Sequence, residues 1–238
     1  MYLERRIGRI FARIQVEKAL IVCHGLPYEP GSVVEKSYTD LAYLFSKRGF
    51  PTVIFDFSGT GLSEGHFNLK SWVEDLLTVA ENFDQVSVLG YSMGGAVAVR
   101  AAVEMQNLQK LVVVSSPCCI DLFSDQILKM VYENARVKNT LRGVGSFERF
   151  RDSFLRDFSE IEPRNWIENV KVDKLIVHGE LDSIVPFENG ITLYNLSKDP
   201  KTFLVVEKGD HFLRKDERVL NLIADWLEGR IKEKIIRI

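Results

Sequence analysis

The sequence predicts an α/β fold, in which a mostly parallel sheet of about eight strands has helices on both faces. Short β-branched runs alternate along the chain with segments of helical spacing, an order typical of parallel strands joined by crossover helices. The strand-like runs are almost continuously apolar, as strands buried on both faces are. The chain has 238 residues, of which 46% are hydrophobic, so a single domain over 1–238 can bury a large core.

The chain opens with a segment that differs from this pattern. Residues 2–16, "YLERRIGRIFARIQV", are typical of a small antiparallel hairpin with Gly8 near its turn, and we expect it on one edge of the main sheet. The main strands are expected in six apolar runs, which are "KALIVCHG", "PTVIFDFSG", "VSVLGYS", "KLVVVSSP", "KLIVHGE" and "TFLVVEKG".

Three segments between these runs carry apolar residues at helical spacing. The first ends at Gly49, a residue type that often follows the last turn of a helix in a left-handed conformation. The apolar faces of the three segments are Tyr38, Leu41, Leu44 and Phe45; Trp72, Leu76, Val79 and Phe83; and Val219, Leu220, Ile223 and Leu227.

From about Pro117 to Arg164 the alternation stops and only helical spacing remains. An insertion after the carboxyl end of a strand would lie over the crevice where open α/β sheets bind ligands. We therefore expect 117–164 to form a small helical cap inserted late in the sheet; the alternative is an ordinary pair of packing helices. One apolar stripe of this segment supplies the candidate substrate-binding residues Phe147, Phe150 and Phe154, and continues to Phe158.

Composition excludes several functional classes. The net charge of −2 comes without a basic stripe, which argues against a nucleic-acid partner. The N-terminus has no apolar signal-peptide region, and no apolar run reaches the ~20 residues of a membrane span, so we expect no stable membrane insertion. Three cysteines, an odd count, favour reduced thiols in a cytoplasmic protein. No Cys/His cluster has metal-ligand spacing, and the sequence predicts neither a metal nor a cofactor.

The stretch "GYSMG" contains a serine between glycines where an apolar strand-like run meets a helical segment of small residues. A sharp strand-to-helix turn holds such a serine in a strained conformation and exposes its oxygen at the top of the sheet. The amide of Met93 would begin the helix, where partial positive charge favours an oxyanion. We therefore expect Ser92 to be a nucleophile.

A serine nucleophile needs a base that a third group orients. Of the four histidines, His211 follows the last of the apolar runs, and Asp182 lies on the loop after the preceding run. With Ser92, both would converge above the carboxyl ends of the strands, in the chain order Ser, Asp, His. The other histidines fit structural or loop roles, because His24 and His178 each precede a glycine at a strand end and His66 lies in a polar loop.

Five motifs in order make the chain similar to the α/β-hydrolase fold family over essentially its whole length. They are "HGL" (24–26), "DFSGTGLSEG" (56–65), "GYSMGG" (90–95), "HGELDSIVP" (178–186) and "GDHF" (209–212). The resemblance implies a Ser92 nucleophile, an Asp182 acid and a His211 base, with Leu26 supplying the second oxyanion amide. Ser58 stands where the family commonly has arginine, which removes a positive charge near the site. The chain resembles most the small capped carboxylesterases, including enzymes like monoacylglycerol lipases and feruloyl esterases.

The expected activity is hydrolysis of a small-molecule carboxylic ester, with a short or medium acyl group or an aryl group, through an acyl-enzyme on Ser92. The same three residues would serve a peptidase or aminopeptidase, a thioesterase, a C–C bond hydrolase or a perhydrolase. A non-catalytic ligand-binding copy of the fold is the alternative from a different class. A serine at position 92 excludes a halide-retaining dehalogenase, which needs a carboxylate there. The sequence does not specify the oligomeric state.

Overall fold

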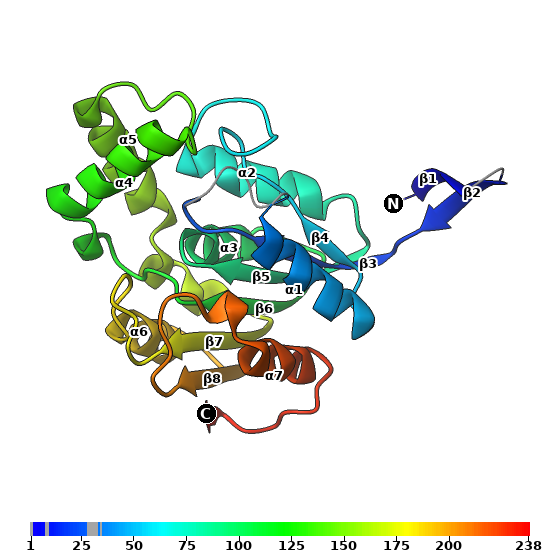
Figure 1. Cartoon of the computed structure of the whole chain (residues 1–238). Helices are drawn as coiled ribbons and strands as arrows, with labels where there is room; N and C mark the ends of the chain where they lie inside the picture. Colours follow the sequence, from blue (N-terminus) through cyan, green and yellow to red (C-terminus); the bar gives the residue numbers. More distant parts are fainter. Residues whose placement is uncertain (1, 8–9, 28–32, 34) are drawn as a thin grey trace.

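A computed structural model describes residues 2–7, 10–27, 33 and 35–238 of the chain, with the backbone alone described for 2–7 and 10–15. Its main sheet has seven strands, all parallel, in the order β4-β3-β5-β6-β7-β8-β9 (Figure 1). The six predicted runs form the strands β3 (Lys18–Cys23), β4 (Thr52–Ile54), β5 (Gln85–Tyr91), β6 (Leu108–Val114), β7 (Asp173–Gly179) and β8 (Lys201–Val206). The predicted α/β architecture with a mostly parallel sheet is confirmed. The short edge strand β9 (Ile235–Arg237) was not expected.

Helices cover both faces of the sheet, as crossover connections between parallel strands require. On one face α1 (Lys36–Lys47) and α7 (Glu217–Leu227) pack on the strands. On the other face lie α2 (Leu69–Ala80), α3 (Met93–Ala102) and α6 (Glu188–Leu196). Helix α1 ends as predicted, since Gly49 follows its C-cap with a φ of +86°. Helix α6 is a further element that sequence patterning did not predict.

The N-terminal hairpin forms, but not on the edge of the main sheet. Strands β1 (Tyr2–Ile7) and β2 (Ile10–Gln15) pair with each other antiparallel and make a separate two-stranded sheet (Figure 1). The predicted position was therefore wrong. Strand β2 leads almost directly into β3, whose two edges already pair with β4 and β5, so the hairpin cannot extend the sheet beside β3. Gly8 lies outside the described residues.

The segment between β6 and β7 contains two helices, α4 (Asp125–Lys138) and α5 (Phe147–Ile161), and three short 3₁₀ turns, Ile120–Leu122, Pro163–Asn165 and Ile167–Asn169. Both helices begin at a serine N-cap, where the Ser124 and Ser146 side chains accept hydrogen bonds from the backbone amides of Ile127 and Arg149. Figure 1 shows α4 and α5 together at one end of the sheet, beside α2.

The cysteines differ from the expectation of three reduced thiols. The neighbouring residues Cys118 and Cys119, just after β6, are joined by a disulfide, whereas Cys23 is free and buried in β3. A bridge between adjacent residues closes no length of chain, so it does not form a disulfide framework. Among the described residues, no helix is long and apolar enough to cross a membrane.

Candidate active site

Ser92 occupies the sharp turn between β5 and α3. Its φ of 51° and ψ of −123° are rare for a residue other than glycine. The surrounding backbone holds this conformation, because the Ser92 amide donates to the Val114 carbonyl at 2.9 Å and the Ser92 carbonyl accepts from the Gly95 amide at 2.9 Å. The strand-turn-helix context predicted for this serine is therefore present.

Two glycines allow the turn to pack tightly. A Cβ on Gly90 would lie 2.6 Å from the Gly94 carbonyl oxygen, and a Cβ on Gly94 would lie 2.4 Å from the His24 carbonyl oxygen. Real Cβ atoms do not approach backbone so closely. The spacing of glycines around the serine thus follows from the close approach of β3, β5 and α3.

Asp182 and His211 lie together beyond the ends of β7 and β8. The Nδ1 atom of His211 is 2.8 Å from Oδ2 of Asp182. The other carboxylate oxygen accepts the backbone amides of Ile184 at 3.0 Å and Val185 at 2.8 Å. The structure therefore brings these two predicted residues into direct contact across the loops that follow neighbouring strands.

The Asp182 carboxyl is buried, and burial alone would raise its pKa. Hydrogen bonds from His178, His211 and the Val185 amide outweigh this effect, and electrostatic attraction to His211 adds to them. Together they hold the pKa of Asp182 far below its usual range. His178 contributes from within the core, where its Nε2 atom is 3.5 Å from Asp182 and 2.9 Å from the Val185 carbonyl oxygen. Asp182 is thus a stable anion facing His211.

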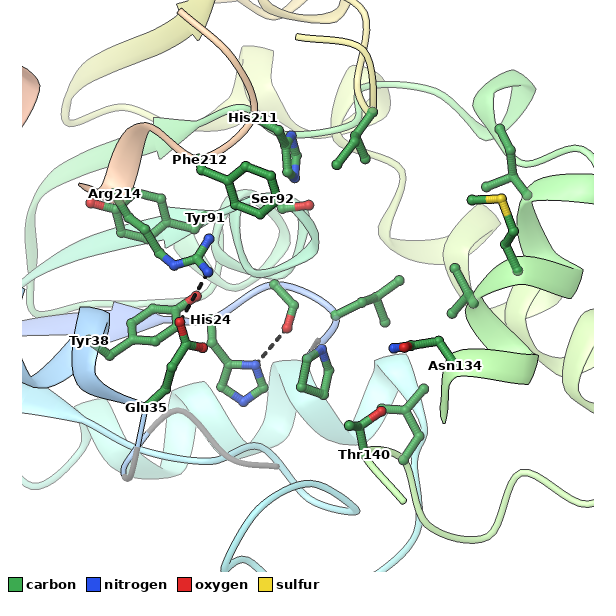
Figure 2. Close-up of a pocket in the computed structure, with 18 residues that line it drawn as sticks. His24, Glu35, Tyr38, Tyr91, Ser92, Asn134, Thr140, His211, Phe212 and Arg214 are labelled. Atoms are coloured by element: carbon green, nitrogen blue, oxygen red, sulfur yellow. Dashed lines mark hydrogen bonds and ion pairs between the residues drawn. The ribbon is translucent and has the colours of Figure 1, made fainter. Parts of the chain in front are cut away.

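Ser92 and His211 line one cavity of about 420 Å³ (Figure 2). Among the described residues, neither ring nitrogen of His211 is hydrogen-bonded to the Ser92 hydroxyl, a gap common in sites without substrate. Helix α4 and the segment after it contribute an apolar side of this cavity, through Ile127, Met130, Val131 and Leu141.

The loop after β3 carries Leu26, which also lines the cavity. This loop packs closely against Ser92, since a Cβ on Gly25 would lie 2.9 Å from Cβ of Ser92. The buried ring of His24 anchors the loop: its Nε2 atom accepts the Phe57 amide at 3.1 Å, which leaves Nδ1–H to donate to the Gly25 carbonyl at 2.6 Å. Met93 begins α3, next to Ser92. Both predicted oxyanion amides therefore belong to segments that meet at Ser92.

The phenylalanine stripe of α5 lies elsewhere, which corrects the expectation that Phe147, Phe150 and Phe154 line the substrate cavity. None of the three is among the residues of its wall. The ring of Phe154 packs 4.9 Å from that of Phe123, Phe150 packs 5.9 Å from Phe67, and Phe147 packs against Tyr132. These rings dock α5 onto α4 and onto the segments that precede α2 and α4.

Two charged residues in the cavity wall were not found from the sequence. Glu35, just before α1, and Arg214, three residues after His211, form an ion pair with 3.1 Å between Oε1 and Nη2. The position where the family commonly has arginine, Ser58, instead bonds to Asp75 and lies outside the wall of this cavity. The only available signal for Arg214 was its place in the loop that carries the predicted base.

The parallel sheet and the serine at its strand-to-helix turn are typical of the hydrolases with an α/β fold. The chain belongs to the alpha/beta hydrolase family, whose model matches residues 20–235. The chain is 24% identical over 195 residues to a Salmonella typhimurium protein named "Uncharacterized protein YfhR", covering 75% of this chain and 61% of that one. It spans only 54 to 61% of the length of such curated relatives.

Solved structures share the fold at low identity. A monoacylglycerol lipase from Paleococcus ferrophilus superposes with a TM-score of 0.68 at 19% identity, covering 89% of this chain and 94% of that one. A bromoperoxidase from Bacillus anthracis gives a TM-score of 0.69 at 17% identity, covering 97% and 100%. At these identities the likeness concerns the fold, so the reaction must be argued from the site.

Proposed function

We propose that this chain is a serine hydrolase that cleaves carboxylic esters through an acyl-enzyme on Ser92. One observation carries the proposal: a serine in a strained turn shares a cavity with a histidine whose far nitrogen is 2.8 Å from a buried carboxylate. A serine hydroxyl alone is a weak nucleophile, and an imidazole held in this way supplies the base that it needs.

In the proposed reaction the Ser92 oxygen attacks the ester carbonyl while His211 takes the serine proton at Nε2. Asp182 accepts the Nδ1–H of His211, which fixes the tautomer and stabilises the imidazolium. The amides of Leu26 and Met93 stabilise the oxyanion of the tetrahedral intermediate. His211 then gives its proton to the departing alcohol, and a water activated by the same imidazole releases the acid.

The proposed substrates are esters with a short or medium acyl group or an aryl group. The cavity volume of about 420 Å³ is in the range of small-molecule sites, and the wall from α4 offers apolar contact. The cytoplasmic location that the sequence favours stays a prediction, as does the cap role of 117–164.

Two measurements test the proposal. A fluorophosphonate probe should form one covalent adduct on Ser92, located by mass spectrometry of the digested protein, and none on the Ser92→Ala variant. A panel of p-nitrophenyl esters, aryl esters, monoacylglycerols, thioesters and aminoacyl amides should show turnover of the oxygen esters that the same substitution removes. If the probe labels Ser92 but only amides or thioesters are turned over, Ser92 is supported as the nucleophile and the ester substrate is rejected.

A further inference from the structure

The wall of the cavity that faces away from α4 contains an ion pair among aromatic side chains. Figure 2 shows Glu35 and Arg214 paired on one side of Ser92, with Asn134 and Thr140 on the other side. The Glu35 and Arg214 side chains are only 23% and 13% exposed. This half-buried ion pair joins α1 to the loop after β8 and also lines the cavity that contains Ser92.

The guanidinium of Arg214 is held in a fixed position. Its Nε donates to the Ser37 hydroxyl at 3.1 Å and its Nη2 to Oε1 of Glu35 at 3.1 Å. Its carbon lies 5.3 Å from the ring centre of Tyr38 and 5.4 Å from that of Phe212. An arginine fixed by two hydrogen bonds and two rings loses little entropy when a ligand binds.

Each partner retains one unused atom. In the part of the chain that the structure describes, neither Nη1 of Arg214 nor Oε2 of Glu35 is hydrogen-bonded, since Ser37 and Nη2 both use the Oε1 atom. The ion pair therefore keeps a donor, Nη1, and an acceptor, Oε2, in the wall of a cavity whose α4 side is mostly apolar.

The charges select the kind of group that fits. Burial favours neutral Glu35, but the Ser37 hydroxyl and the charge of Arg214 keep the pKa of Glu35 below its usual value, so both members are ionised at neutral pH. The pair is neutral in sum. A substrate carboxylate would have to approach the charge of Glu35, whereas a hydroxyl can accept from Nη1 and donate to Oε2 without adding charge.

We propose that Glu35 and Arg214 form a specificity-determining subsite for an uncharged hydroxyl group on the substrate, so that the preferred ester is apolar toward α4 and hydroxylated at its other end. This inference rests on the proposed ester hydrolysis and names its substrate class. The hydroxyl can belong to the acyl part or to the alcohol part, and separate substrate series distinguish the two.

The test compares matched esters that differ in one terminal group. The acyl series is p-nitrophenyl hexanoate, its ω-hydroxyhexanoate and the adipate monoester; the alcohol series is the butanoates of hexanol, of the matching diol and of the matching hydroxy acid. We expect the hydroxyl ester of one series to exceed the alkyl ester in kcat/KM by about tenfold, the scale of one well-formed hydrogen bond. The double variant Glu35→Gln/Arg214→Met should lose this preference, so that its hydroxyl-to-alkyl ratio of kcat/KM falls to about one.

The single variant Glu35→Gln separates recognition from mere packing. It leaves the charge of Arg214 uncompensated, so the adipate ester, or the carboxylate ester of the alcohol series, should gain relative to the hydroxyl ester. The matched control is Arg48→Met, which removes another half-buried arginine that pairs with Asp225 and Glu228 of α7 and its C-cap. It should lower the melting temperature and leave the substrate ratios unchanged.

An unchanged hydroxyl-to-alkyl ratio in the double variant, or a wild-type preference for the carboxylate ester, would overturn the subsite. If the wild type turns over no ester, calorimetric titration of Ser92→Ala with the hydroxyl and alkyl esters compares the same contacts without chemistry. Equal affinities there would also reject the subsite, whereas a preference that depends on Glu35 and Arg214 would keep it and reject only the proposed reaction.

Discussion

Ser92 has a backbone conformation that few residues other than glycine adopt, and the glycines near it pack so closely that an added Cβ would meet neighbouring atoms. Gly94 is the tightest of these neighbours, since a Cβ there would lie 2.4 Å and 2.5 Å from the carbonyl oxygens of His24 and Cys23. The same two residues precede the loop that bears Leu26. Crowding at Gly94 would therefore move the proposed nucleophile, Ser92, and the proposed oxyanion amide of Leu26 together.

We expect Gly94→Ala to lower kcat/KM strongly and to destabilise the fold by about 1–3 kcal/mol, the usual cost of overpacking, or more. Gly49→Ala is the matched control. Its φ of +86° makes it costly too, but nothing lies within 4 Å of the added methyl group, so activity should be retained. Ester assays and urea unfolding of both variants measure this difference. Equal loss of activity in the two would show that general destabilisation, and not displacement of the turn, is responsible.

The ionisation of Asp182 predicts how stability depends on pH. Its pKa is lower in the folded chain than the usual value of about 3.9, so the unfolded chain binds more protons in the interval between the two values. The stabilisation is complete above that usual value and is lost as the pH falls through the folded pKa. Asp182→Asn should therefore lose less of its free energy of unfolding than the wild type between about pH 5 and pH 2. Parallel curves from urea unfolding across this range would contradict the prediction.

At the scale of elements, the two helices between β6 and β7 cover different surfaces. Helix α4 contributes Ile127, Met130 and Val131 to the cavity, whereas α5 buries Phe150, Phe154 and Phe158 against neighbouring elements. Periodicity indicates which residues share a face of a helix, but not which of two available surfaces that face covers.

This division predicts opposite effects of substitutions in the two helices. Phe154→Ala removes a fully buried ring and should cost about 3–5 kcal/mol in stability with the acyl-chain preference unchanged. Ile127→Ala enlarges the cavity and should shift the acyl-chain preference toward longer groups with a small loss of stability. Melting curves and a p-nitrophenyl ester series report the two quantities. A shifted acyl-chain preference in Phe154→Ala would contradict this prediction and indicate that Phe154 contacts the substrate.

The strands β3 and β5 to β8 could be predicted because each buries a compact, almost continuous apolar run in the sheet. The two elements that escaped prediction lack such a signal: β9 is a three-residue edge strand, and α6 contains Asn189 and Gly190 in its first turn. The catalytic candidates were recognisable from local motifs. The pair of Glu35 and Arg214 was not, because its members are 179 positions apart and meet only after α1 and the loop beyond β8 are in place.

At the scale of the molecule, the parallel sheet explains why the candidate residues meet. Ser92, Asp182 and His211 follow the carboxyl ends of β5, β7 and β8, and in a parallel sheet these ends share one edge. The hairpin β1–β2 has no part in this arrangement. It is hydrogen-bonded within itself and to no strand of the main sheet among the described residues.

We therefore expect deletion of residues 1–15 to leave both the melting temperature and ester hydrolysis close to those of the full chain. The deletion keeps Val16, which packs on the core, and all of β3, whose hydrogen bonds run to β4 and β5. An isolated two-stranded hairpin is at best marginally stable in water, so it can add little to the stability of the main domain. Differential scanning calorimetry and ester assays of the two proteins give the comparison. A large drop in melting temperature on deletion would show that the hairpin packs on the main domain. A melting temperature that depends on protein concentration in the full chain, but not in the deletion variant, would show that the hairpin packs on a second copy.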